Sequence, residues 1–407
     1  MSVSLKSIVV LILVLGSGAV VFHSANSHLT FAILVAIVFL WITVRSKPII
    51  FNIKYLVLFV TLGVAVFLTM MLNGDASNYL SYLNSTARIL IPFMVPLLIS
   101  FQDFVKIYLR IIIFLAISSL VIFLLLLIDP NWYRAFPKTV GLTGLEYYNL
   151  FLYVVSDHGV GSRNNSIFWE PGAFQAFLTL GLLFEVYLYK LRRGKNILIL
   201  ILASVTTVST TGYIILLILL TATFIFLRPT KIKKSHLILG LPFVLLCIAF
   251  MAPLFFQLIF AKFAENNQSS FLRLSRTIVD LTLFFGSPFY GLGLSNYSTK
   301  VAETSYDLFS LDLGGSFNSL TYYLAVYGIL FVAPLLWMYV KFCRVLTHDK
   351  RQAAIIFIIV MITFASENFL CSLLWLTLGF YGAHAAINRT HLNLSGFSST
   401  PKEINYG

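Results

Sequence analysis

The most regular feature of the sequence is a series of long apolar stretches separated by short polar segments. The runs Ile111 to Ile128 and Ala353 to Phe364 carry no charged side chain. About 20 apolar residues cross the hydrocarbon core of a bilayer as a helix, and in lipid a helix satisfies every backbone polar group within its own segment. Windows of suitable length lie near 5–22, 29–44, 53–72, 86–100, 107–128, 168–189, 195–208, 211–227, 236–258, 317–340, 353–365 and 369–387. The pattern predicts an all-α, polytopic integral membrane protein with about twelve transmembrane helices.

Composition supports the same class. Of the 407 residues, 59% are hydrophobic and only 11% are charged, more apolar surface than a water-soluble fold can enclose in one core. We expect residues 1–407 to form a single membrane domain. The first span is not expected to be a cleaved signal, because a second span follows closely and no small-residue cleavage pattern stands out.

Basic residues predict the orientation of the spans. With the N-terminus inside, 20 of the 28 lysines and arginines fall in inner segments, including 190–195, 228–234 and 341–351. Cytoplasmic loops are enriched in Lys and Arg, so both termini are expected in the cytoplasm. The net charge of +13 is thus explained by topology, and no basic soluble domain suggests a nucleic-acid partner.

Two outer segments, 129–167 and 259–316, are much longer than the other connections. Long loops in a compact protein are usually functional or disordered, and these are rich in aromatic residues and glycine. We expect them to fold over the outer mouth of the helical bundle. The sequence has no motif of a metalloprotease, serine hydrolase or kinase, and its three cysteines form no metal-binding pattern, so neither metal nor cofactor is predicted.

The first long loop ends in the segment Arg163-Asn-Asn-Ser-Ile-Phe-Trp-Glu170-Pro171-Gly172. Proline favours the first turn of a helix, so Glu170 is expected at the start of the sixth span. One interpretation is a capping acid stabilised by the helix dipole. The other is a buried acid/base or a partner for arginine, because ionisable groups at the membrane edge tend to face cavities.

The second long loop contains an amphipathic helical pattern. Arg273, Arg276 and Asp280 lie at i, i+3 and i+7, which places them on one helix face. Their helix could lie in the membrane interface with its arginines near lipid head groups. Alternatively, the two guanidinium groups point the same way and bind an anion, since paired arginines match the oxygens of phosphate.

Taken in order, these motifs resemble the Wzy-type O-antigen and capsule polymerases of the O-antigen ligase-like superfamily of membrane glycosyltransferases. The resemblance rests on the FWEPG segment, on the Arg273 helix followed by Pro288 and a Gly-Leu-Gly turn, and on Ser316-Phe317-Asn318 before a span containing Tyr327-Gly328-Ile329. The turn 209–212 is also similar to a short turn of that family. The likeness covers most of residues 85–390, with each motif degenerate by itself.

One departure favours the polymerases over the ligases of the superfamily. Ligases typically carry a histidine immediately before the asparagine that opens the tenth span, and this chain has Phe317 there. His158 in the first long loop is an alternative base, although a lone loop histidine is more often solvated.

The resemblance implies transfer of a glycan from undecaprenyl diphosphate to a hydroxyl group of another lipid-linked repeat unit, at the periplasmic face and without metal. Repeat units would thereby be polymerised into O-antigen, capsule or exopolysaccharide. In this scheme Arg273 and Arg276 stabilise the diphosphate leaving group, and Glu170 accepts the proton of the acceptor hydroxyl. The expected substrate-binding residues are Arg88, Arg163, Asn318 and Glu367, with Glu367 as the second candidate base. Expected partners are undecaprenyl-diphosphate-linked glycans, membrane lipid and a chain-length regulator protein.

Two other classes remain open at the level of sequence. A flippase for lipid-linked oligosaccharides also needs arginines for a diphosphate, but it should line its path with intramembrane charges and show related halves. The predicted spans are nearly free of charge. A scaffold subunit of a glycan assembly complex has no distinguishing pattern.

Overall fold

The computed structural model describes residues 3–20, 52–140, 146–156, 163–226, 268–311 and 318–388. Twelve α-helices and a small sheet lie in this part of the chain. The helices are α1 (Val3–Leu15), α3 (Ile53–Leu72), α4 (Tyr79–Leu98), α5 (Phe101–Ile128), α6 (Pro171–Leu183), α7 (Gly194–Thr206), α8 (Thr210–Phe226), α10 (Gln268–Gly286), α11 (Leu294–Phe309), α12 (Ser319–Leu346), α13 (Lys350–Ser366) and α14 (Leu373–Asn388). A π-helical turn, η4 (Phe184–Leu188), continues α6, and short 3-10 turns occur at η2 (Ala76–Asn78) and η3 (Trp132–Ala135).

Capping side chains explain where several helices begin. Asn52, Ser100, Asn318 and Asp349 each accept a hydrogen bond from a backbone N–H in the first turn of the helix that follows. Such caps satisfy N–H groups that have no partner within the helix. The starts of α3, α5, α12 and α13 therefore follow from local sequence.

Four described helices are long and apolar enough to cross a membrane: Ile53–Leu72, Phe101–Ile128, Pro171–Leu188 and Ser319–Leu346. The predicted count of twelve spans is not reproduced in the described residues. Helices α13 and α14 have 17 and 16 residues, which at 1.5 Å per residue gives about 24 Å, short of the roughly 30 Å hydrocarbon core. Leu5–Leu15, Gly194–Thr206 and Thr210–Phe226 are also apolar but shorter than a full crossing. The windows 29–44 and 236–258 lie outside the described residues.

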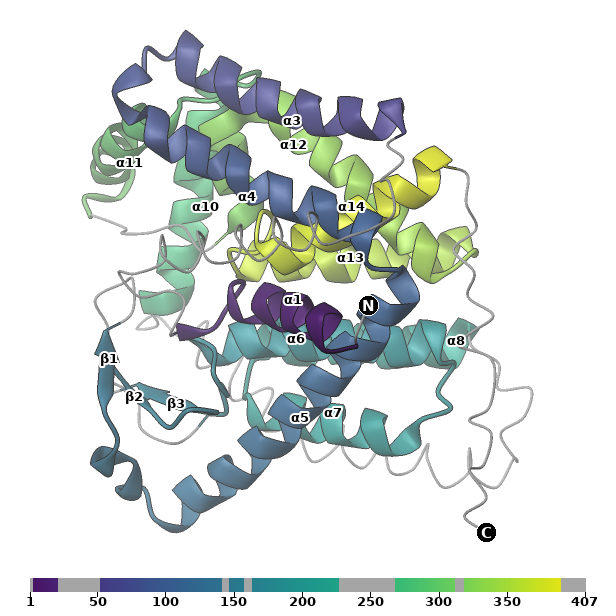
Figure 1. Ribbon diagram of the computed structural model, residues 1–407. Coiled ribbons are helices and arrows are strands. Elements are labelled where there is room, and N and C mark those ends of the chain that lie inside the picture. The colour runs from purple at the N-terminus through teal and green to yellow at the C-terminus, as the bar shows by residue number, and fades with distance from the viewer. Residues whose placement is uncertain are drawn as a thin grey trace.

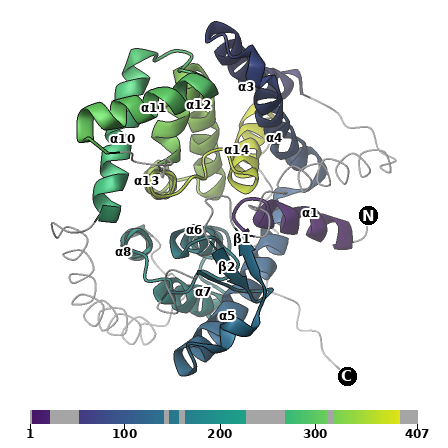
Figure 2. The same cartoon turned by 90° about the vertical axis from the view of Figure 1, so that its left-hand side faces the viewer.

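The described helices pack as two groups that meet side by side. Helices α3, α4, α10, α11, α12, α13 and α14 form the upper group in Figure 2, and α5, α6, α7 and α8 form the lower one. Helix α1 packs against both α5 and α14, while α13 packs against α6 and α8. The turn after α13 and the start of α6 are thereby brought to the same boundary between the groups (Figure 1).

Polar contacts distinguish two ends of this bundle. At one end Lys6 of α1 pairs with Asp103 of α5, and Asn52 donates to Asn388 across the α3 and α14 termini at 2.7 Å. The opposite end carries the sheet, α10 and α11, on the left of Figure 1. The described parts of the segments 129–167 and 259–316 therefore lie at the same end of the bundle.

The first of these segments contains strands that the all-α prediction missed. Strands β1 (Lys138–Val140), β2 (Glu146–Asn149) and β3 (Val154–Ser156) form an antiparallel sheet in the order β1-β2-β3. Tyr153 and Val155 pack with Phe123 and Leu126 at the end of α5. Strands of three or four residues are too short to give a clear alternating pattern in the sequence.

The second segment contains a turn, between α10 and α11, that packs into a break in α12. Gly328 has φ +72°, and the interrupted helix bonds instead to the turn before α11. Leu292 N donates to the carbonyl of Ala325 at 2.9 Å, and Ile329 N donates to that of Pro288 at 2.8 Å. Non-helical backbone is tolerated at membrane depth where protein satisfies its polar groups. The Gly-Leu-Gly turn and the Tyr-Gly-Ile segment, both noted in the sequence, are thus a single interlocked feature.

Asp75 fixes the start of α11 beside this interlock. Its carboxylate accepts hydrogen bonds from the Ser295 backbone and hydroxyl at 3.1 and 2.6 Å, from Asn78 at 2.8 Å and from Tyr82 at 2.7 Å. Burial alone would raise the pKa of Asp75, but these hydrogen bonds lower it to about 2. The ionised carboxylate joins the α3–α4 connection to α11.

Candidate functional site

Glu170 lies at the junction of the first outer segment and α6. Its backbone is extended, with φ −152° and ψ 161°, and Pro171 occupies the first helical position as the sequence predicted. Its side chain makes no capping hydrogen bond to the first turn of α6. The carboxylate lies instead 3.6 Å from Nη2 of Arg273, measured from Oε2. The geometry therefore favours the arginine-partner interpretation of Glu170 over the capping one.

Arg273 of α10 connects this carboxylate to the end of α13. Its Nη1 donates to the carbonyl of Ser366 at 2.8 Å, while Nη2 faces Glu170. About a third of each partner remains exposed, with side-chain values of 36% for Arg273 and 32% for Glu170. The pair is accessible to a ligand and held in place by a backbone contact.

Glu367 follows Ser366 directly and lies against Glu170. Its residue is 4% exposed, and its carboxyl group is hydrogen-bonded to that of Glu170. The acid occupies the space where a Cβ on Gly172 would lie, so the glycine after Pro171 permits this approach. Burial, and then the negative charge of Glu170, raise the pKa of Glu367 well above its usual range.

Arg163, in the loop before α6, is held against the α7–α8 turn. Its Nε donates to the carbonyl of Thr207 at 3.2 Å, and the backbone N–H of the neighbouring Asn164 donates to the Thr206 carbonyl at 2.9 Å. Loss of water around the guanidinium lowers the pKa of Arg163, whereas the charge of Glu170 raises it. An arginine stays protonated under such opposing influences, so Arg163 supplies a second positive charge.

We call Arg163, Glu170, Arg273 and Glu367 the four-residue cluster. Its members come from the loop before α6, the start of α6, helix α10 and the turn after α13. Guanidinium groups bind anions and carboxyl groups transfer protons, so this set of residues can do both. The sequence proposed all four residues for function but ranked Glu367 low, because no arginine is near it along the chain.

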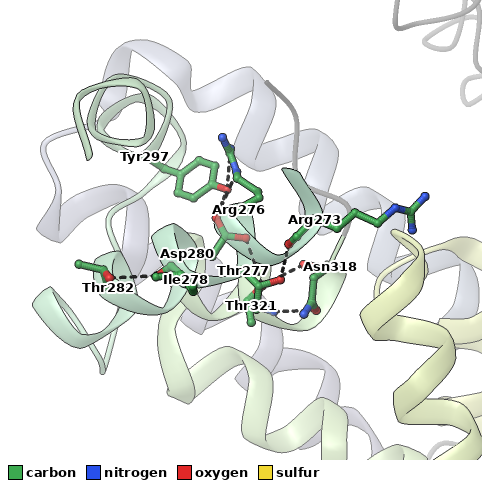
Figure 3. Close-up of polar contacts among 9 residues, drawn as sticks. All are labelled: Arg273, Arg276, Thr277, Ile278, Asp280, Thr282, Tyr297, Asn318 and Thr321. Carbon is green, nitrogen blue, oxygen red and sulfur yellow. Dashed lines mark hydrogen bonds and ion pairs between the residues drawn. The ribbon is translucent and has the colours of Figure 1, made fainter. Parts of the chain in front are cut away.

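Arg276 does not join this cluster, although it lies one turn from Arg273. Its residue is 4% exposed, its Nε lies 3.5 Å from Asp280 Oδ1, and its Nη2 donates to the Tyr297 hydroxyl at 3.1 Å. Tyr297 and Thr321 in turn donate to Asp280. Figure 3 shows the Arg273 and Arg276 guanidinium groups pointing in different directions. The prediction that the two guanidinium groups point the same way is therefore wrong. Arg276 turns toward the buried carboxylate of Asp280, whereas Arg273 reaches the Ser366 carbonyl.

Two further candidates also have other surroundings. Arg88 is an exposed residue of α4, a helix that packs against α3 and α14. The side-chain oxygen of Asn318 accepts hydrogen bonds from Leu320 N and Thr321 N at the start of α12. Asn318 is thus a helix cap in this structure. His158 and Phe317 lie outside the described residues.

The turn between α7 and α8 proves to be part of the site wall. Gln175 of α6 accepts from the Thr207 hydroxyl at 3.1 Å and fills the space beside Gly212. Tyr213 lies close enough for Arg163 to act on its hydroxyl. The sequence offered this turn as a family likeness only, and its small residues were the signal that another chain segment approaches closely.

Within the described residues, no group of three or more His, Cys, Asp and Glu side chains is arranged to hold a metal ion. Comparisons with known proteins do not assign the chain to a family. No known family matches the sequence, and no significantly similar curated protein was found.

Proposed function

We propose that the chain is a membrane glycosyltransferase that polymerises undecaprenyl-diphosphate-linked oligosaccharide repeat units at the periplasmic face of a bacterial inner membrane. The observation that carries this proposal is the four-residue cluster. It places the Arg273 guanidinium 3.6 Å from a Glu170 carboxylate that is about a third exposed, and the charge of Glu170 also acts on the nearby Arg163. The motif order that resembles the Wzy-type polymerases supports the same reaction.

The topology belongs to the proposal. A bundle of membrane-spanning helices would place the sheet, α10 and α11 outside, with both chain termini in the cytoplasm. Support comes from the long apolar helices and from the cationic segment 190–195 at the end of the bundle opposite the cluster. Cytoplasmic loops carry the excess of Lys and Arg in such proteins.

In the proposed mechanism the two arginines bind the diphosphate of the donor. Arg273 presents a planar guanidinium already oriented by the Ser366 carbonyl, and Arg163 is oriented by the Thr207 carbonyl. Fixed donors of this kind stabilise charge that develops on a leaving group without further reorganisation. The sugar–oxygen bond to the diphosphate breaks, and its electron pair leaves with the diphosphate.

Glu170 is the proposed general base. The acceptor hydroxyl passes its proton to the Glu170 carboxylate as its oxygen forms the new bond to the anomeric carbon of the donor. A positioned base contributes roughly a hundred- to ten-thousand-fold to such a step. The products are a longer glycan on one lipid and free undecaprenyl diphosphate.

Incubation of the purified protein with lipid-linked repeat units tests the reaction. The proposal predicts a ladder of longer products without added nucleotide sugar or metal. A ligase of the same superfamily would instead transfer the glycan only to a different acceptor lipid. A flippase or scaffold would leave the repeat units unextended, and that result would contradict the proposal.

A further inference from the structure

The contact between the carboxyl groups of Glu170 and Glu367 requires a proton. A carboxyl oxygen of Glu367 packs against Gly172, two residues after Glu170, and the two carboxyl groups are hydrogen-bonded to one another. An ionised carboxylate can only accept a hydrogen bond. One of the two must therefore carry a proton. Two ionised carboxylates at this separation would also repel each other strongly in a site largely shielded from water.

The surroundings of the two acids differ in a way that assigns the proton. Glu170 is partly exposed, and its carboxylate faces the Arg273 guanidinium at 3.6 Å. Glu367 is 4% exposed and packs against Gly172. The charged groups that face it are Glu170 from α6, Arg273 from α10 and Arg163 from the preceding loop. Two tyrosines border the same cluster, Tyr213 beside Arg163 and Tyr147 beside Glu170.

We propose that Glu170 and Glu367 hold one proton between them at neutral pH, and that Glu367, as its holder, is the positioning residue for the Glu170 carboxylate. The role of Glu170 as base rests on the proposed function, whereas the sharing of the proton does not. The Glu367 hydroxyl donates to the Glu170 carboxylate. A carboxylate has about four lone-pair sites, so Glu170 can accept this bond, face Arg273 and still take the proton of an acceptor hydroxyl.

A neutral Glu367 also keeps the four-residue cluster cationic. Two arginines and one carboxylate leave one net positive charge, which attracts an anionic diphosphate. Ionisation of Glu367 would cancel that charge and push the two carboxylates apart. Donor binding and the orientation of the base would then both weaken as the pH rises through the titration of Glu367.

Infrared spectroscopy of the purified protein tests the proton directly and needs no enzymatic activity. At pH 7 the wild type should show the carbonyl absorption of a protonated carboxylic acid, and Glu367→Gln should remove it. Glu303→Gln makes the same chemical change at an exposed position of α11 and should leave the absorption intact. An unchanged spectrum in Glu367→Gln would overturn the proposal.

The variant Glu170→Gln provides an independent test if Glu367→Gln does not fold. In Glu170→Gln the neighbouring negative charge is lost, so the acid absorption should persist to a less alkaline pH than in the wild type. An identical titration in the two proteins would contradict a shared proton.

The pH dependence of polymer formation connects the pair to the reaction. Glu367→Gln keeps an N–H donor toward Glu170 but cannot ionise, so the decline of the wild-type rate at alkaline pH should be reduced or lost. An unchanged alkaline decline would remove Glu367 from the mechanism. If neither protein forms polymer at any pH, the proposed function fails, while the infrared result still decides whether the proton is shared.

Discussion

Arg273 and Arg276 lie one helical turn apart on α10, yet they belong to two different polar groups. Arg273 reaches the Ser366 carbonyl and Glu170, whereas Arg276 is enclosed with Asp280 and Tyr297. The first arginine is partly exposed and the second is buried. The same substitution should therefore have different consequences at the two positions.

Arg273→Ala should leave the protein folded and abolish polymer formation. A partly exposed ion pair contributes about 0–1 kcal/mol to stability, while loss of the guanidinium removes a proposed diphosphate ligand. Lysine should restore activity only in part, because a point charge lacks the forked geometry of arginine. Arg344→Ala, at an exposed position of α12, is the matched control and should retain full polymer length.

Arg276→Ala should instead destabilise the protein. Removing one partner of a buried ion pair leaves Asp280 uncompensated and costs about 3–5 kcal/mol. Thermal unfolding in detergent should therefore show a much lower midpoint than for Arg273→Ala. If Arg276→Ala is as stable as the wild type but inactive, this prediction is contradicted and Arg276 has a direct role in the reaction.

The break in α12 gives a prediction about the interlocked turn. Gly328 has a positive φ, and a Cβ there would collide with the Phe289 backbone. A non-glycine residue held in such a conformation costs about 1–3 kcal/mol before any clash is added. Gly328→Ala should lower the unfolding midpoint, whereas Gly194→Ala, where a Cβ meets nothing within 4 Å, should not. Equal midpoints would show that the turn does not depend on this glycine.

The raised pKa of Glu367 predicts a pH-dependent stability. Because the folded protein holds this proton more tightly than the unfolded chain, the free energy of unfolding should fall as the pH rises from the ordinary glutamate pKa to the raised one. Glu367→Gln should lack this part of the slope, and Glu303→Gln should keep it. Thermal unfolding midpoints of the two variants, measured from pH 5 to 8, test this. Parallel pH profiles for Glu367→Gln and Glu303→Gln would contradict the prediction.

Reporter fusions test the proposed topology. Fusions at Arg193 and Arg351 should report the cytoplasm, and a fusion at Ser298 should report the periplasm. Arg193 lies 3.9 Å from Glu185 at the end of α6 opposite Glu170. The same compartment for Arg193 and Ser298 would contradict both the topology and the location of the cluster.

Local signals explain what the sequence could predict. The window 53–72 coincides with α3, because an apolar run begins directly after the cap Asn52. The start of α6 at Pro171 followed from the preference of proline for the first helical turn. The helical pattern around Arg273 corresponds to α10.

The features that the sequence could not predict depend on contacts between segments far apart in the chain. The partnership of Glu170 with Glu367 depends on how α13 packs against α6, and neither residue carries a local sign of the other. Helical spacing placed Arg273 and Arg276 on one face but could not reveal that Asp280, Tyr297 and Thr321 surround the second. The glycine at position 172, against which Glu367 packs, was the one sign in the sequence that another segment approaches there.

The central claim is that the four-residue cluster carries out glycosyl transfer with Glu170 as base. Its most direct test compares polymer ladders from purified wild type, Glu170→Gln and Glu303→Gln with lipid-linked repeat units at matched protein levels. Glutamine keeps the size and an acceptor oxygen but cannot take up the proton. The account predicts a rate about a hundred- to ten-thousand-fold lower for Glu170→Gln, with a normal ladder for Glu303→Gln. A normal ladder from Glu170→Gln would contradict it.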